Sequence, residues 1–82
     1  MSKNFIKRNI QLTLEFDSYL LKKPELFDQI PNKSGIVMTV KGDYYYNRLS
    51  RSMAKASAPH IKQIVEARKE GTKWRIVNPA FS

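Results

Sequence analysis

The chain has 82 residues, with 15 Lys or Arg against 7 Asp or Glu, so its formal net charge is +8 at pH 7. This length suits one small domain over residues 1–82, and an apolar fraction of 41% is typical of a folded chain. No cysteine is present, which excludes disulfides, thiolate metal sites and a cysteine nucleophile. The single histidine, His60, argues against a histidine metal site, and we expect neither a metal nor a cofactor.

The apolar segments are short and interrupted by charges. None approaches the ~20 residues of a membrane span. The opening residues, MSKNFIKRNI, lack the apolar core and cleavage site of a secretory signal. We therefore expect a cytoplasmic protein with no membrane association.

Residues 4–22 predict a helix with two adjacent apolar faces, and Asn4 is a suitable N-cap. The apolar arc covers more than half of the circumference, which is wider than on an ordinary surface helix. We expect the helix to bury one face on its own sheet and the other on a second helix or a second subunit. The first face carries Phe5, Leu12, Phe16, Tyr19 and Leu20, and the second carries Ile6, Ile10, Leu14 and Leu21.

The middle of the chain predicts a short helix, a strand and a second long helix. Pro24 begins PELFDQI and Pro31 ends it. Residues 35–40, GIVMTV, have the uncharged, β-branched composition of a strand covered on both faces. Residues 44–57 follow as a second long helix. We expect its core face to consist of Tyr46, Leu49, Met53 and Ala56.

Residues 60–77 allow two interpretations. Helix propensity favours a helix that begins near Pro59 and ends at Gly71. The other interpretation is a hairpin, with strands at 61–68 and 72–77 joined by residues 69–71. We prefer the hairpin because a sheet of fewer than three strands is rarely stable. The predicted fold is a small α/β (α+β) domain of order α-α-β-α-β-β, with a βαβ crossover and a C-terminal hairpin.

Two motifs carry a family resemblance. The first is N-F-I-x-x-N-I-x-L-x-x-E-F-x-x-Y-L from Asn4 to Leu20, and the second is P-E-L-x-x-x-I-P from Pro24 to Pro31. With GIVMTV and the ending IVEARKEGTKWRIVNP, they resemble a family of small prokaryotic domains of unknown function. The resemblance implies the same order of elements, fits the hairpin better than the helix, and indicates a cytoplasmic prokaryotic setting. It brings no catalytic residues with it.

Nothing in the sequence has the pattern of an active site. The glycines Gly35, Gly42 and Gly71 are isolated, so there is no phosphate-binding loop. The carboxylates are scattered among basic neighbours, and His60 lies in a connection. We expect a protein that is not an enzyme.

One stripe on the second long helix points to a binding function. Tyr44, Arg48, Arg51 and Lys55 have the spacing i, i+4, i+7, i+11, opposite the expected core face, and no acidic residue occurs from 44 to 65. The simpler interpretation is a solvated face that keeps the protein soluble. Our leading hypothesis is a nucleic-acid contact in which the cations, extended by Lys62, bind phosphates and Tyr44 stacks on a base.

A second hypothesis concerns the first helix. Asn9, Thr13 and Asp17 recur at i, i+4, i+8 between its apolar faces, where they either face water or fix the register of a helix–helix contact. With Phe16 and Leu20 they form our candidate interface for a homodimer, which would stabilise so small a domain. The alternative function is a protein–protein module, antitoxin-like or an accessory subunit, that uses this wide apolar face to bind an acidic partner.

Overall fold

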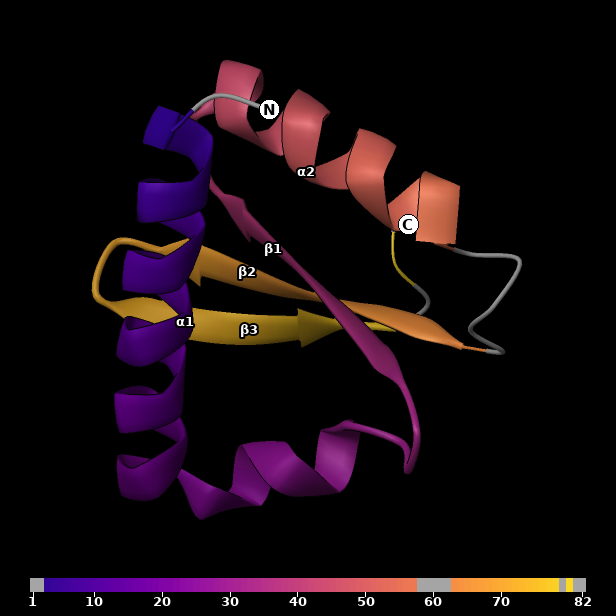
Figure 1. Ribbon diagram of the computed structural model, residues 1–82. Helices are drawn as coiled ribbons and strands as arrows, with labels where there is room; N and C mark the ends of the chain where they lie inside the picture. Colours follow the sequence, from indigo (N-terminus) through magenta and orange to yellow (C-terminus); the bar gives the residue numbers. More distant parts are fainter. Residues whose placement is uncertain (1–2, 58–62, 79, 81–82) are drawn as a thin grey trace.

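The computed structural model describes residues 3–57, 63–78 and 80, and Figure 1 shows the arrangement of its elements. Two helical segments precede the first strand, and a long helix separates it from a hairpin. The elements are α1 (Lys3–Lys22), the 3₁₀ helix η1 (Pro24–Gln29), β1 (Gly35–Val40), α2 (Tyr44–Ser57), β2 (Ile64–Glu70) and β3 (Lys73–Val77).

The three strands form one mixed sheet of order β1-β2-β3. β1 and β2 are parallel and connected through α2, whereas β2 and β3 are antiparallel. The predicted fold class, element order and hairpin are therefore confirmed. The predicted hairpin loop was wrong: Lys69 and Glu70 belong to β2, and Gly71 with Thr72 makes the turn. Gly71 has φ +67°, a conformation that glycine adopts without strain and that hairpin turns favour at this position.

α1 and η1 cover one face of the sheet and enclose the core. Leu12 and Phe16 of α1 are almost completely buried against Val65 and Trp74 of the hairpin. The rings of Phe16 and Trp74 lie 5.0 Å apart in a tilted arrangement. The first predicted apolar face of this helix is thus its core face.

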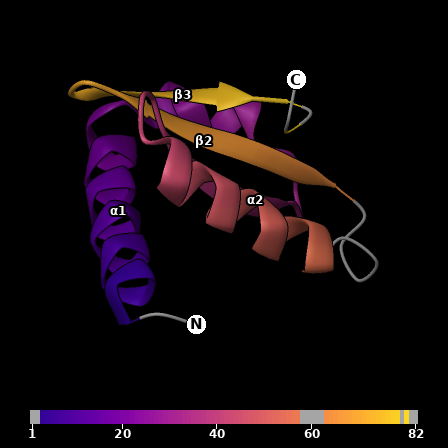
Figure 2. The same ribbon diagram turned by 90° about the horizontal axis from the view of Figure 1, so that it is seen from above.

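Seen from above, β2 and β3 lie over η1, and α2 lies beside β2 on the side of the sheet that α1 and η1 do not cover (Figure 2). Side chains alternate along a strand, so the residues between the core positions of the hairpin face this side. They include Glu66 and Arg68 of β2 and, by register, Arg75 of β3. The hairpin is therefore polar on the face opposite the core.

α2 lies beside the outer edge of β1 and bonds to it with polar side chains. Asn47 accepts a hydrogen bond from Val40 N–H and donates one to Val40 C=O, both at 2.8 Å. Ser50 Oγ donates to Met38 C=O at 2.6 Å. The side chain of Asn47 thus replaces the neighbouring strand that an edge strand lacks.

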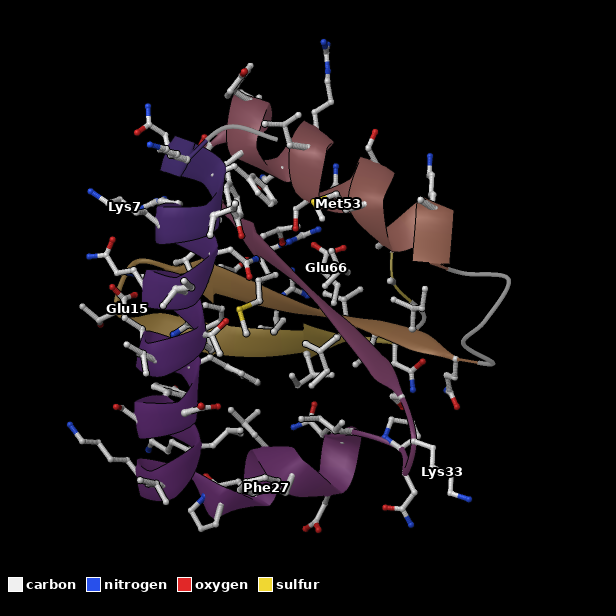
Figure 3. All side chains as sticks on the ribbon, viewed as in Figure 1. Lys7, Glu15, Phe27, Lys33, Met53 and Glu66 are labelled. Atoms are coloured by element: carbon white, nitrogen blue, oxygen red, sulfur yellow. The ribbon has the colours of Figure 1, made fainter. Side chains whose placement is uncertain are left out.

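The expected core face of α2 was partly wrong. Tyr46 is buried, but Met53 is 41% exposed, and Asn47 and Ser50 are buried in its place (Figure 3). The reason is that this helix packs against a strand edge, whose free N–H and C=O groups need hydrogen-bonding partners rather than apolar cover.

Among the described residues, neither α1 nor α2 combines the length and the apolar character that crossing a bilayer requires.

The role of Asn47 leads to a stability prediction. Asn47→Ala leaves both β1 edge groups at Val40 without a partner, so we expect a loss of about 2 kcal/mol in the free energy of unfolding. Urea denaturation followed by circular dichroism measures the change. The neighbouring Arg48→Ala, on the exposed side of the helix, is the control and should change stability by less than about 0.5 kcal/mol. Equal stabilities of the two variants would contradict this role.

Candidate nucleic-acid interface

The residues of the predicted stripe on α2 line one shallow hollow. Its volume is about 380 Å³, and Tyr44 at its rim is 84% exposed. The lining residues are Tyr44, Asn47, Arg48, Arg51, Ser52 and Lys55. All four predicted stripe residues are therefore brought together, whereas Lys62 and His60 lie outside the described residues.

A buried carboxylate lies between α2 and the sheet. Glu66 of β2 has no exposed surface and is found between the ribbons of β2 and α2 (Figure 3). Its Oε2 accepts a hydrogen bond from Thr39 Oγ1 at 2.6 Å. The same oxygen accepts from Arg68 Nε at 3.0 Å and Nη2 at 2.8 Å. These charge-assisted bonds offset the cost of removing a carboxylate from water.

Arg51 also turns toward this carboxylate. Its Nη2 lies 3.7 Å from Glu66 Oε2, and its Nε is buried without a hydrogen-bond partner. We expected Arg51 to be unpaired because no acid occurs within residues 44–65, but the first acid after that stretch is its partner. Arg51 consequently joins α2 to β2, and its side chain is 39% exposed.

The face of the sheet opposite the core extends this positive charge. Arg68 and Arg75 are register partners on β2 and β3, and Lys73 lies two residues before Arg75 on the same face. Arg75 Nη2 bonds Glu70 Oε2 at 3.3 Å, and its side chain remains half exposed. We call Arg51, Arg68 and Arg75 the arginine row, because they follow one another across α2, β2 and β3.

Sequence reasoning missed the two arginines of the hairpin. The sequence signal that could have indicated Arg68 is the alternation of apolar and charged residues in 64–68. Val65 and Ala67 are apolar, whereas Glu66 and Arg68 are charged. In a strand, this pattern places a Glu and an Arg side by side on the face opposite the core.

The stripe and the sheet face together form one surface, which we call the basic surface. It carries six cations and two carboxylates, Glu66 and Glu70, so its net charge of +4 is half of that of the whole chain. Its residues are Tyr44, Arg48, Arg51, Lys55, Arg68, Lys73 and Arg75.

The candidate interface residues on α1 mostly face inward. Phe16 and Leu20 belong to the core, so they present no surface to a partner. Asn9 Nδ2 donates to Tyr46 Oη at 2.9 Å, and Thr13 Oγ1 donates to the carbonyl of Asn9 at 2.8 Å. The polar groups that we considered for a helix–helix contact are thus satisfied within the chain, and only Asp17 is exposed.

In the part of the chain that the structure describes, no three His, Cys, Asp or Glu side chains come close enough to hold a metal ion.

The position of Glu66 leads to a second stability prediction. Glu66→Gln removes the charge that Arg51 and Arg68 share and leaves two guanidinium groups facing each other. We expect a loss of about 2–4 kcal/mol, somewhat below the cost of breaking a completely buried pair, because both arginines are partly exposed. Chemical denaturation measures it, with Glu25→Gln on the exposed surface of η1 as the control. A Glu66→Gln variant as stable as the control would show that the carboxylate does not hold α2 and β2 together.

Comparison with known proteins found one family model, and neither a curated protein nor a solved structure matched the chain. The model, described as a family of unknown function (DUF5647), matches residues 4–78. This range includes all six structural elements apart from the first residue of α1. It confirms the predicted resemblance to a family of unknown function, and the chain therefore belongs to the DUF5647 family, whose function is unknown.

Proposed function

We propose that this domain is a cytoplasmic, non-enzymatic binding module that contacts nucleic acid through the basic surface. The observation that supports the proposal most directly is the arginine row. It continues the cations of α2 over β2 and β3, on the sheet face that α1 and η1 do not cover (Figure 2).

The chemistry of the row suits phosphate. A guanidinium group presents a planar fork of donors that matches two phosphate oxygens. Glu66 holds Arg68 through two donors and leaves its remaining N–H groups to other acceptors. An arginine that is already oriented loses less side-chain entropy when it binds.

Tyr44 adds a second kind of contact. The residue is 84% exposed and lines the hollow beside Arg48, so a base can stack on its ring while the backbone phosphates bind the cations. We therefore propose recognition through phosphates and stacking, without readout of base edges.

A protein-binding function remains the second candidate, and the exposed residues of α1 support it. Ile6, Ile10 and Leu14 keep about half or more of their surface exposed outside the core.

The test of nucleic-acid binding is the salt dependence of affinity. We expect short single- and double-stranded oligonucleotides to bind several-fold or more weakly at ~200 mM than at ~50 mM salt, as measured by fluorescence anisotropy. The double variant Arg48→Gln/Arg75→Gln should lower the log–log slope for duplex by about 1.8, since each phosphate contact contributes ~0.9. Both side chains are exposed, so circular dichroism should show an unchanged fold.

The matched control is Lys23→Gln/Lys33→Gln, which lowers the net charge equally but lies in the connections around η1. It should leave the slope within about 0.3 of that of the unmodified protein. Equal losses in the two double variants would show that net charge alone drives binding and would exclude the basic surface as a site. Heparin binding of equal strength and salt dependence would reject nucleic acid as the specific partner, and no binding at ~50 mM salt would reject the proposal as a whole.

A further inference from the structure

α1 carries a line of aliphatic side chains that its own fold does not use. Ile6, Ile10 and Leu14 are 46%, 56% and 63% exposed, and they follow one another at i, i+4, i+8 on the side of the helix away from the core. We call these three residues the α1 stripe. Single exposed aliphatic residues are common on protein surfaces, but an aligned series of this kind marks a contact face.

Two opposite charges lie in line with the stripe. At 100° per residue, Lys3 and Asp17 each fall within about 20° of Ile10 around the helix axis. Lys3 is one turn before the stripe and Asp17 is one turn after it, both exposed. Neither takes part in an ion pair with another described residue.

We propose that the α1 stripe is the contact between two copies of this chain, whose α1 helices pair antiparallel about a two-fold axis at Ile10. In this register, the residue numbers of two facing residues add up to 20. Ile6 then faces Leu14 of the second copy, and Ile10 faces its own counterpart. Lys3 faces Asp17 of the second copy, and the symmetry repeats that ion pair at the other end.

The distribution of charge identifies a second copy as the occupant. A positive end and a negative end at equal distances from Ile10 are complementary to themselves only when the helix is reversed. The antiparallel arrangement also brings the positive end of each helix dipole beside the negative end of the other. An acidic partner would attract Lys3 but repel Asp17, so only one of the two charges would favour its binding.

The neighbouring side chains fit such a contact. Lys7, Gln11 and Ser18 lie on one side of the stripe and are all exposed, which gives the contact a polar rim. Glu15 is held by Lys69 within the chain and does not compete for Lys3. A helix pair of this length makes a small interface, so we expect a dissociation constant in the micromolar range, about 1–100 μM.

The first test is the molar mass by sedimentation equilibrium from about 5 to 500 μM protein at ~0.15 M salt. The unmodified chain should pass from 9.6 kDa toward twice that mass, 19.2 kDa. Ile10→Asp places two carboxylates together at the axis and should weaken the dimer by about tenfold or more. Phe27→Asp is the control: Phe27 is equally exposed, at 54%, but lies on η1, and its variant should dimerise normally.

The second test reverses the charges and reports the register. Lys3→Glu and Asp17→Lys each create two like-charge contacts in a homodimer and should weaken it by roughly 5–30-fold. An equimolar mixture of these two variants has only opposite charges facing each other and should restore dimers. The double variant Lys3→Glu/Asp17→Lys should also dimerise.

Three results would overturn the proposal. One is a mass of 9.6 kDa at every concentration. Another is an Ile10→Asp variant that dimerises like the unmodified chain while circular dichroism shows that both are folded. The third is a mixture of the charge variants that stays as weak as each variant alone, which would exclude the antiparallel register.

Discussion

The carboxylate of Glu66 is the group on which the arrangement of α2 and the sheet depends. A carboxylate with no exposed surface is tolerated only when cations and hydrogen-bond donors surround it. Thr39 of β1, Arg68 of β2 and Arg51 of α2 supply them from three different elements. The same pairing directs two arginines of the basic surface to one place, so one interaction both stabilises the fold and orients the groups that we propose for binding phosphate.

The elements of the fold were predictable because local signals agree with one another. Residues 35–40 and 44–57 have the predicted bounds, since Gly42 follows the end of a β-branched run and Asp43 caps the helix that comes next. The orientation of α2 was less predictable. Hydrophobic periodicity assumes that a helix buries apolar residues, whereas Asn47 and Ser50 are buried because they bond the edge of β1. The buried face of a helix that packs on a strand edge therefore cannot be predicted from hydrophobicity alone.

The candidate site was predictable to the extent that it lies within one element. The i, i+4, i+7 spacing placed Tyr44, Arg48 and Arg51 on one side of α2, as the structure has them. Their link to Arg68 and Arg75 depends on the parallel pairing of β1 with β2 and on the register of the hairpin, which no local pattern contains. The two faces of α1 show the same limit: both were recognised as apolar, but only tertiary structure shows which one forms the core.

The α1 stripe and the basic surface belong to opposite sides of the sheet, because α1 packs on the core face and the arginine row lies on the other. A dimer formed through α1 therefore leaves two basic surfaces open. The longest dimension of one copy is 33 Å, which corresponds to about ten base pairs of duplex at ~3.4 Å each. A short oligonucleotide can occupy only one copy, whereas a longer strand can reach both and gain avidity from the effective concentration of the second surface. Self-association through α1 would thus strengthen the proposed binding without contributing a single residue to the basic surface.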